Sequence, residues 1–346
     1  MFASIRNIFV NIMAAFIRNK EARHDFRSRN KKKNISNKID EIYALIERFR
    51  DLQKERSYIF RVTPLDNLPP QGPESEVYLA IACISKNEAP YLREWIEYHK
   101  IVGVERFYFY DNESDDNTKE VLEPYIKDGT LVYHFLPNHP ITGQRQQIEA
   151  YNDAIFKYRS RTKWMAIIDI DEFLVPVEKN SVTEFLADYD QYPAVVANWV
   201  CFDSNGHEKK PAAHGGLLTA NYTRVRKNHE NFFDTQFKSI VNPKKVVNYI
   251  SEHHGLYYSN QDAVNENFDV VQGQFTKYHS ASRIRINHYY TKSREEYSNK
   301  VMRNTKGSQS VYKFNESYLN FKENTIEDRV IQKYLPKLKA SMEIMD

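Results

Sequence analysis

The pattern of apolar and polar positions changes once along the chain, near residue 76. Before that point, apolar residues recur at helical spacing and predict two helices, one over residues 2–16 and one over 37–57. Prolines at 64, 69, 70 and 73 then indicate a linker. We therefore expect a helical N-terminal extension over 1–75, a catalytic domain over 76–307 and a C-terminal helical segment over 308–346.

The second part alternates apolar runs with amphipathic segments. Strands are predicted at 77–85, 106–110, 131–136 and 164–170, with helices at 91–102, 116–127 and 143–158 between them. This order predicts an α/β fold with a doubly wound, mainly parallel, Rossmann-like sheet. Further strands are expected at 195–202, 236–241, 246–252 and 284–290, followed by helices at 293–305 and 325–342.

The N-terminal extension also carries a charge pattern. Its first apolar helix face is followed by eight Lys or Arg between Arg18 and Lys33, against Glu21 and Asp25. Such a segment can lie on an anionic membrane surface, although a helix docked on the catalytic domain would show the same pattern. No window reaches the roughly 18 apolar residues of a membrane span. We expect a cytoplasmic protein, peripheral at the inner face of the plasma membrane.

Overall composition narrows the class of partner. The net charge of +3 among 346 residues is too small to favour nucleic-acid binding. Cys83 and Cys201 lie in apolar runs and are expected to be buried without a disulfide. Glycine-rich phosphate loops of the dinucleotide-binding and P-loop kinds are absent from the sequence.

A cluster of acids follows the fourth predicted strand. Asp169, Asp171 and Glu172 come directly after an apolar run, and ligands of open α/β sheets bind beyond the carboxyl ends of their strands. Buried carboxylates need a compensating cation. A divalent ion that also binds a diphosphate meets this need. In an extended segment Asp169 and Asp171 would lie on one side. The alternative is a pair of solvated loop acids.

Several further segments form a recognisable pattern along the chain. They are CISKNE (83–88), YLREW (91–95), YH (98–99), GVERF (103–107), YDNESDD (110–116), Trp164, DIDEF (169–173), Trp199, Phe202, SNGH (204–207), INHYYTKS (286–293), EEY (295–297), Lys300 and Arg303. Taken in this order, the segments resemble glycosyltransferase family 92 and related bacterial glycosyltransferases of the GT-A fold that contain a DxD motif. The resemblance covers about residues 76–307, with Asn304 where a glycine is expected.

The resemblance implies a GT-A fold and a Mn²⁺- or Mg²⁺-dependent, inverting glycosyltransferase. The sugar, with galactose favoured, would pass from a UDP-sugar to a hydroxyl of a glycan or glycolipid. With the basic N-terminus, this favours bacterial surface polysaccharide or lipopolysaccharide synthesis. A non-catalytic glycan-binding module on the same fold and a sugar nucleotidyltransferase are the alternatives. The latter normally has a glycine-rich loop after the first strand.

The resemblance also implies a nucleotide-sugar site near the strand ends. The alternative to a nucleotide contact is a helix-capping role for Asn87 and a turn-forming role for Asp111. For Arg145, as for the lysines and arginine of the late helix, the alternative is ordinary surface charge. The residues expected to contact the nucleotide sugar are Asn87, Glu88, Asp111, Arg145, Asp169, Lys292, Lys300 and Arg303.

The metal ligands expected are Asp169, Asp171 and a histidine, which is His288 or else His254. An inverting transferase needs one carboxylate base near the acceptor hydroxyl, and the sequence leaves Asp234, Glu266 and Glu208 as candidates. Trp199, Phe202 and His207 are the candidate acceptor-binding residues, with Trp199 in the core as the alternative.

Overall fold

The computed structural model describes residues 75–137, 145–229, 232–307, 315–321 and 324–344. The N-terminal extension, with its predicted helices and membrane contact, lies outside the described residues. Within the described part of the chain, no helix is both long enough and apolar enough to cross a membrane.

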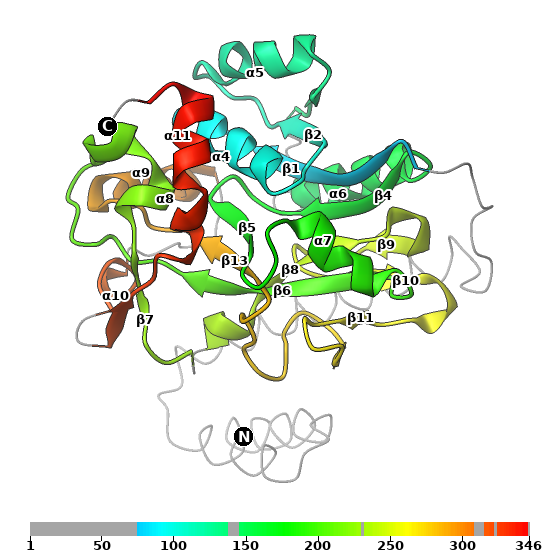
Figure 1. Cartoon of the computed structure of the whole chain (residues 1–346). Coiled ribbons are helices and arrows are strands. Elements are labelled where there is room, and N and C mark those ends of the chain that lie inside the picture. Colours follow the sequence, from blue (N-terminus) through cyan, green and yellow to red (C-terminus); the bar gives the residue numbers. More distant parts are fainter. Residues whose placement is uncertain (1–74, 138–144, 230–231, 308–314, 322–323, 345–346) are drawn as a thin grey trace, which may run out of the picture. The chain divides into compact units, whose positions relative to one another are not determined.

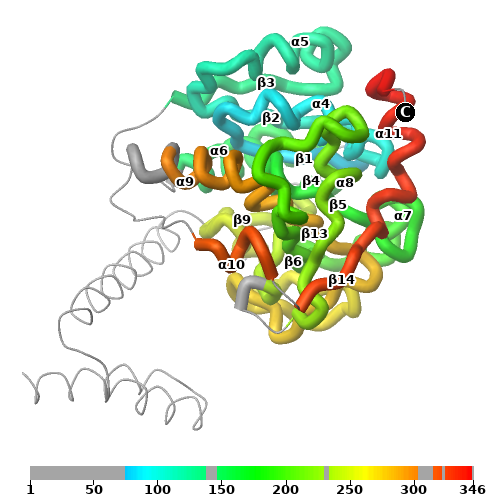
Figure 2. The backbone as a smooth tube through the Cα atoms, turned by 90° about the vertical axis from the view of Figure 1, so that its left-hand side faces the viewer, coloured from blue at the N-terminus to red at the C-terminus, as the bar shows by residue number. Residues whose placement is uncertain are grey.

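Four parallel strands form one half of the main sheet, in the order β4-β1-β2-β3. In Figure 2 they lie one below another, from β3 uppermost through β2 and β1 to β4. The strands are β1 (Val77–Ser85), β2 (Arg106–Asp111), β3 (Leu131–Phe135) and β4 (Thr162–Ile167). The predicted α/β fold of the GT-A type is confirmed, because a helix follows each of the first three strands and returns the chain to the same edge.

Helices cover both faces of this half. The helices are α4 (Ala89–Ile101), α5 (Thr118–Lys127) and α6 (Arg145–Tyr158). Alternation along β1 sends Leu79 and Ile81 into the core that contains α4, while Ala80 and Ala82 enter the core that contains α6. Small side chains on the second face let α6 lie close to the sheet. The continuous apolar run of β1 thus reflects burial on both faces.

The other half of the sheet is mixed. Strand β8 (Phe237–Val241) lies antiparallel between β4 and β6 (Ala194–Cys201). Strand β13 (Ile284–His288) pairs parallel with β6 and antiparallel with β5 (Glu172–Pro176), a strand that was not predicted from the sequence. The edge continues through β11 (Ala263–Val264) and β12 (Val270–Val271).

Shorter elements complete the described chain. They are α7 (Val182–Leu186), α8 (Leu218–Asn221), β7 (Arg224–Arg226), β9 (Val246–Tyr249), β10 (Gly255–Tyr257), α10 (Glu316–Leu319) and the 3-10 turns Ala187–Tyr189, Ala213–Gly216, Phe232–Thr235, Pro243–Lys245 and Tyr258–Asn260.

The chain ends in α9 (Arg294–Gly307), β14 (Thr325–Glu327), the 3-10 helix Val330–Tyr334 and α11 (Leu335–Met342). The predicted helix over 325–342 is wrong in its first half. Residues 325–327 pair with β7, and the α-helix begins only at Leu335, where a proline occupies its first turn. Helix α11 packs against α4, as Figures 1 and 2 show.

Candidate active site

A pocket of about 370 Å³ opens at the carboxyl ends of the parallel strands. This is the edge where open α/β sheets bind ligands. Its walls come from the ends of β1 and β4, the segment after β2, and the helices α6 and α9. The lining residues are Ile84, Ser85, Lys86, Glu88, Asn112, Gln146, Gln147, Asp169, Ile170, Asp171 and Lys300.

The acidic cluster forms a turn between β4 and β5. Strand β4 ends at Ile167, so the strand predicted over 164–170 is three residues too long. The backbone N–H of Glu172 donates to the Asp169 carbonyl at 3.1 Å. The Asp169 N–H donates to the Glu172 carboxylate at 2.8 Å. Because this segment turns, the expected placement of Asp169 and Asp171 on one side of a strand is wrong. Both still line the pocket, but they contact different partners.

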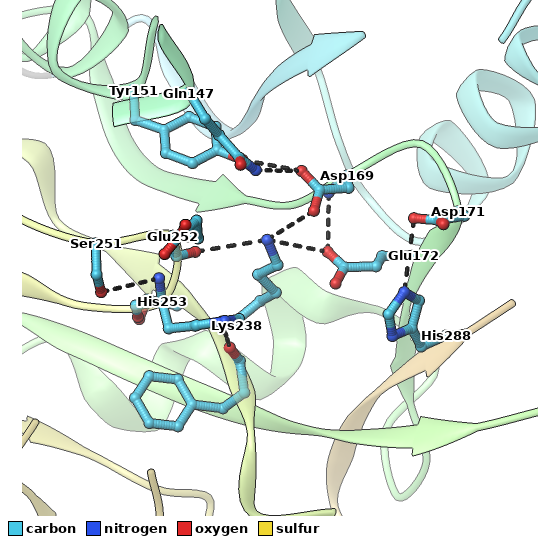
Figure 3. Close-up of polar contacts among 12 residues, drawn as sticks. Gln147, Tyr151, Asp169, Asp171, Glu172, Lys238, Ser251, Glu252, His253 and His288 are labelled. Atoms are coloured by element: carbon cyan, nitrogen blue, oxygen red, sulfur yellow. Dashed lines mark hydrogen bonds and ion pairs between the residues drawn. The ribbon is translucent and has the colours of Figure 1, made fainter. Parts of the chain in front are cut away.

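Asp169 is held by side chains from two elements. Gln147 and Tyr151 of α6 donate hydrogen bonds to its Oδ1 at 3.0 and 2.9 Å. Lys238 of β8 donates to its Oδ2 at 2.9 Å. Figure 3 shows the Lys238 ammonium between the carboxylates of Asp169 and Glu172. Only 1% of the Lys238 side chain is exposed.

Glu172 is fully buried at the start of β5. Its Oε2 lies 3.6 Å from the Lys238 Nζ. Burial raises the pKa of the Glu172 carboxyl, although Lys238 acts in the opposite direction. Since Asp169 makes the shorter contact with Lys238, we assign the negative charge to Asp169 and the proton at neutral pH to Glu172.

Asp171 faces the opposite way. Its Oδ2 accepts from Lys300 of α9 at 2.6 Å, and its Oδ1 lies 3.7 Å from His288 Nε2. Burial would raise the pKa of Asp171, but Lys300 and His288 hold that pKa well below its usual range. Burial lowers the pKa of His288. Asp171 is therefore an anion beside a neutral imidazole.

The facing atoms of Asp171 and His288 fit a divalent cation. A carboxylate oxygen and an imidazole nitrogen are ligands that Mn²⁺ accepts. Within the described residues, no group of three or more His, Cys, Asp or Glu side chains is placed to hold a metal ion. A cation bound by this pair would therefore take its other ligands from phosphate oxygens and water.

Of the two candidate histidines, His288 is the one beside the acidic turn. His254 lies in the segment before β10, where its backbone N–H donates to Ser251 and its ring contacts Tyr257.

The residues expected to seat the nucleotide form a linked loop. Glu88 lines the pocket and pairs with Lys292 at 2.9 Å, and the Lys292 ammonium lies 3.9 Å from the centre of the Tyr91 ring. Asn87, with φ of +58°, accepts a hydrogen bond at Oδ1 from the Asp115 N–H, and its own N–H donates to the Ser114 hydroxyl oxygen. The helix-cap alternative for Asn87 is wrong, because residue 88 occupies the N-cap position of α4.

Asp111 accepts hydrogen bonds from the Ser114 N–H at 2.9 Å and from the Tyr133 hydroxyl at 2.6 Å. It thus shapes the turn after β2, and its neighbour Asn112 lines the pocket. Arg145 begins α6 and Arg303 belongs to α9. Their side chains lie outside the described part of the structure, so their contacts with a nucleotide stay predictions.

The three candidate bases have different surroundings. Glu266 accepts hydrogen bonds from the backbone N–H groups of residues 282, 283 and 284 and from two serine hydroxyls, so it holds a loop. Glu208 is 76% exposed and pairs with Arg294. Neither arrangement favours a base at the pocket. Asp234 is buried, 3.7 Å from His229 Nδ1. Burial raises the pKa of the Cys201 thiol, and the nearby Asp234 carboxylate raises that pKa further.

The three candidate acceptor-binding residues also differ in burial and contacts. Trp199 is half-buried with its ring 4.3 Å from that of His288, at the edge of the site. Phe202 is 2% exposed and packs on Tyr289 in the core, so it offers no face to a sugar, and its predicted acceptor role is wrong. His207 is half-buried and contacts the Asn221 carbonyl and the Tyr222 ring.

Comparison with known families identifies the class of this chain. The sequence model of glycosyltransferase family 92 matches residues 76–341. The chain belongs to glycosyltransferase family 92. This confirms the resemblance stated from the sequence motifs. The match also extends beyond residue 307, into the segment that forms β14 and α11.

Curated relatives of this family 92 chain come from plants and a nematode. A family 92 protein of Oryza sativa subsp. japonica is 28% identical over 53% of this chain and 31% of its own length. Galactan beta-1,4-galactosyltransferase GALS3 of Arabidopsis thaliana is 33% identical over 33% of this chain and 25% of its own length. Beta-1,4-galactosyltransferase galt-1 of Caenorhabditis elegans is 24% identical over 59% of this chain and 45% of its own. The chain thus spans about a third of the length of the plant family 92 proteins that it matches.

Solved structures with a similar arrangement are more distant. S. aureus TarS 1-349 in complex with UDP-GlcNAc is 13% identical, with a TM-score of 0.33 over 48% of this chain and 45% of that chain. The mannosyltransferase PcManGT from Pyrobaculum calidifontis, in complex with GDP-Man and Mn2+, is 18% identical, with a TM-score of 0.27 over 47% of each chain.

The structure adds three residues to the predicted site of this family 92 chain. Lys238, Gln147 and Tyr151 all contact Asp169, and none was predicted. A signal for Lys238 exists in the sequence, because this lysine is the one charged residue of the short run Phe237 to Val241, whose other members are three apolar residues and a serine. Lysine is almost never fully buried unless it is paired, so a lysine in a central strand indicates a carboxylate nearby.

Proposed function

We propose that this chain is a metal-dependent, inverting galactosyltransferase that uses UDP-galactose and acts on a hydroxyl group of a glycan. The observation that carries the proposal is the pocket at the strand ends of a family 92 chain, where Asp169, Asp171 and Glu88 lie with Lys300. The names of the Arabidopsis and C. elegans relatives favour galactose as the sugar.

The pocket offers partners for both parts of the donor. Carboxylates suit the hydroxyl groups of ribose and sugar, and Asp169, held by three donors, keeps about one of its four acceptor sites, on Oδ2, for such a contact. Ammonium groups suit the diphosphate, and Lys300 and Lys292 lie at this edge. Asp171 and His288 would hold the cation, which when bound supplies positive charge at the leaving diphosphate.

Transfer with inversion then needs one displacement. The acceptor oxygen forms a bond to the anomeric carbon as the bond from that carbon to the UDP oxygen breaks, and the acceptor proton passes to a carboxylate. We assign that carboxylate to Asp234, because it lies near Cys201, which pairs in register with His288. Trp199, whose ring lies 4.3 Å from that of His288, is our candidate for contact with the sugar that is transferred or received.

The function is tested by UDP release from UDP-galactose in the presence of Mn²⁺, with and without glycan acceptors. Removing the Asp171 charge by Asp171→Asn should lower the rate by about 10²-fold or more, because the cation loses a ligand and the diphosphate loses its counter-ion. An undiminished rate in this variant contradicts the assigned site.

A matched control is Asp203→Asn. Asp203 is fully buried and paired with Arg224 at 2.7 Å, outside the residues that line the pocket. Its loss should cost stability and leave the rate per folded molecule near that of the wild type. A protein that binds glycans, but neither releases UDP nor is stabilised against heat by UDP with Mn²⁺, is instead a glycan-binding module.

A further inference from the structure

Asp169 and Asp171 of the acidic turn each pair with a lysine, but the two lysines differ in how far they are exposed to solvent. Lys300 lies on α9 with 21% of its side chain exposed, so its ammonium can exchange Asp171 for a phosphate oxygen or for water. Lys238 lies on β8 in the middle of the sheet with 1% of its side chain exposed. Because water does not reach this ammonium, a water molecule cannot take the place of Asp169 as its hydrogen-bond partner.

The surroundings of Lys238 leave Asp169 as its main partner. The ammonium lies 2.9 Å from Asp169 Oδ2, 3.6 Å from Glu172 Oε2 and 3.5 Å from the Glu252 carbonyl oxygen. A buried ammonium is costly unless an anion of opposite charge neutralises it. The short contact with Asp169 provides that anion, and the fold itself therefore supplies a cation to one acid of the turn.

From this geometry we infer that Lys238 is a positioning residue, a fixed internal cation that balances Asp169 and leaves the divalent cation to Asp171 and His288. The inference rests on the proposed metal-dependent function. It assigns different work to the two acids: Asp169 is an oriented hydrogen-bond acceptor for the donor, and Asp171 is the metal ligand. It also departs from the sequence-based expectation that both aspartates bind the metal.

The inference is tested by the affinity of the full chain for Mn²⁺ without nucleotide, measured by isothermal titration calorimetry. Lys238→Met should raise that affinity about tenfold, because the unbalanced Asp169 charge then attracts the cation. Asp169→Asn should lower it, since the Lys238 charge is then unbalanced. The double variant should lie within about twofold of the wild type, because both charges are absent.

A matched control is Lys245→Met. Lys245 is a half-buried lysine that donates to three backbone carbonyls at residues 190, 191 and 192, and it is not among the residues that line the pocket. Its loss should change stability without changing the affinity for Mn²⁺. Urea unfolding of the same Lys238 and Asp169 variants gives a second cycle, in which the double variant should lose less stability than the sum of the single variants.

The outcomes separate clearly. A double variant that binds Mn²⁺ as weakly as Asp169→Asn makes Asp169 a ligand and overturns the inference, while the metal-dependent function stands. An unchanged affinity in a folded Lys238→Met protein also overturns it. If Lys238→Met does not fold, Asp169→Asn and the double variant, which has no unpaired buried charge at this position, still decide. A wild type that binds no Mn²⁺ with or without UDP refutes the proposed metal dependence itself, and the inference with it.

Discussion

Ion pairs between lysines and acids organise the pocket at the level of single residues. Each of three acids contacts a lysine from a different part of the chain. Glu88 pairs with a lysine of the segment just before α9, Asp169 with a lysine of β8, and Asp171 with a lysine of α9. Charges at the end of a buried strand are costly unless they are paired. The pairs therefore orient the acids before a donor arrives, which is the arrangement that electrostatic catalysis requires.

The role assigned to Asp234 gives a first prediction at this scale. Asp234→Asn should lower galactose transfer to an acceptor by about 10²- to 10⁴-fold, the range for loss of a general base. Binding of UDP with Mn²⁺ should change little, because Asp234 does not line the donor pocket. Transfer kinetics and UDP titrations measure the two effects, and equal losses in both would instead indicate a structural role.

Glu266 is expected to behave differently. Its carboxylate accepts three backbone N–H groups and two hydroxyls, and these hydrogen bonds outweigh burial and lower its pKa. Glu266→Gln places an amide donor against those N–H groups and should destabilise the fold by about 2–3 kcal/mol. Urea unfolding checks this, and the rate per folded molecule should be unchanged. A stable but inactive variant would restore Glu266 as the base.

At this scale the sequence predicted the acids better than their partners. Asp169 and Asp171 follow a recognisable apolar strand, so their location at the pocket was predictable. Tyr151 and Lys238 reach Asp169 from positions 18 and 69 residues away, respectively. Such contacts depend on how α6 and β8 pack against β4. Without that packing, no local pattern distinguishes Tyr151 from any other tyrosine of a helix.

At the scale of elements, a buried histidine joins α4 to β5 directly behind the acidic turn. His99 is fully buried; its Nδ1 donates to the Trp95 carbonyl at 2.8 Å, and its Nε2 accepts the Leu174 N–H at 3.1 Å. The Trp95 indole N–H donates to the Glu172 carbonyl at 2.8 Å. These bonds fix the start of β5, and with it the orientation of the turn that holds Asp169 and Asp171.

This link predicts a dependence of stability on pH. Burial lowers the pKa of His99 to about 3, against roughly 6.5 in an unfolded chain. As the pH falls, the unfolded state therefore binds a proton at a higher pH than the folded state does. The stabilisation by neutral His99 is complete above about pH 6.5 and is lost as the pH falls from about 6.5 towards 3. The loss has a limiting slope of about 1.4 kcal/mol per pH unit.

Urea unfolding at several pH values between 7.5 and 5 checks this prediction. His99→Gln should be less stable than the wild type at pH 7.5 by about 2 kcal/mol, because a buried hydrogen bond is lost. The difference between the two proteins should shrink as the pH falls. A constant difference would show that His99 titrates normally in the folded protein.

Elements with long, regular patterns were predicted closely, and short ones were not. Strand β1 was predicted with its observed bounds, because seven of its nine residues are buried and leave a nearly continuous apolar run. Strands β5 and β14 were missed for different reasons. The acidic turn before β5 was taken as the end of the preceding strand, and the three residues of β14 are extended only because they pair with β7. Tertiary pairing decides such segments.

At the scale of the whole molecule, the N-terminal sequence leads to a prediction that is independent of the pocket. Its apolar helical face and basic run favour contact with an anionic membrane surface. Deleting residues 1–35 should weaken binding to vesicles containing anionic lipid and leave release of UDP from the donor largely unchanged. Co-sedimentation measures the binding, and a truncated protein that binds vesicles as well as the full chain would exclude this role.

The C-terminal end leads to the opposite expectation. Leu338, Ile331 and Tyr334 are buried, and they belong to the same apolar core as Trp95 and Leu92 of α4. Strand β14 pairs with β7 as well. Ending the chain at residue 307 would expose this core surface, and the loss of each large buried side chain costs about 2–5 kcal/mol.

A chain that ends at 307 should therefore fail to unfold cooperatively, because the loss of three such side chains is comparable to the 5–15 kcal/mol typical of a domain's whole stability. Circular dichroism during heating tests this. A chain that ends at 343 keeps β14 and α11 and provides the control. If the shorter chain melts like the control, the segment after 307 is a separable appendage, as the pattern of the sequence suggested. If it does not, α4, and with it the residues behind the acidic turn, depends on a helix that the chain reaches only at residue 335.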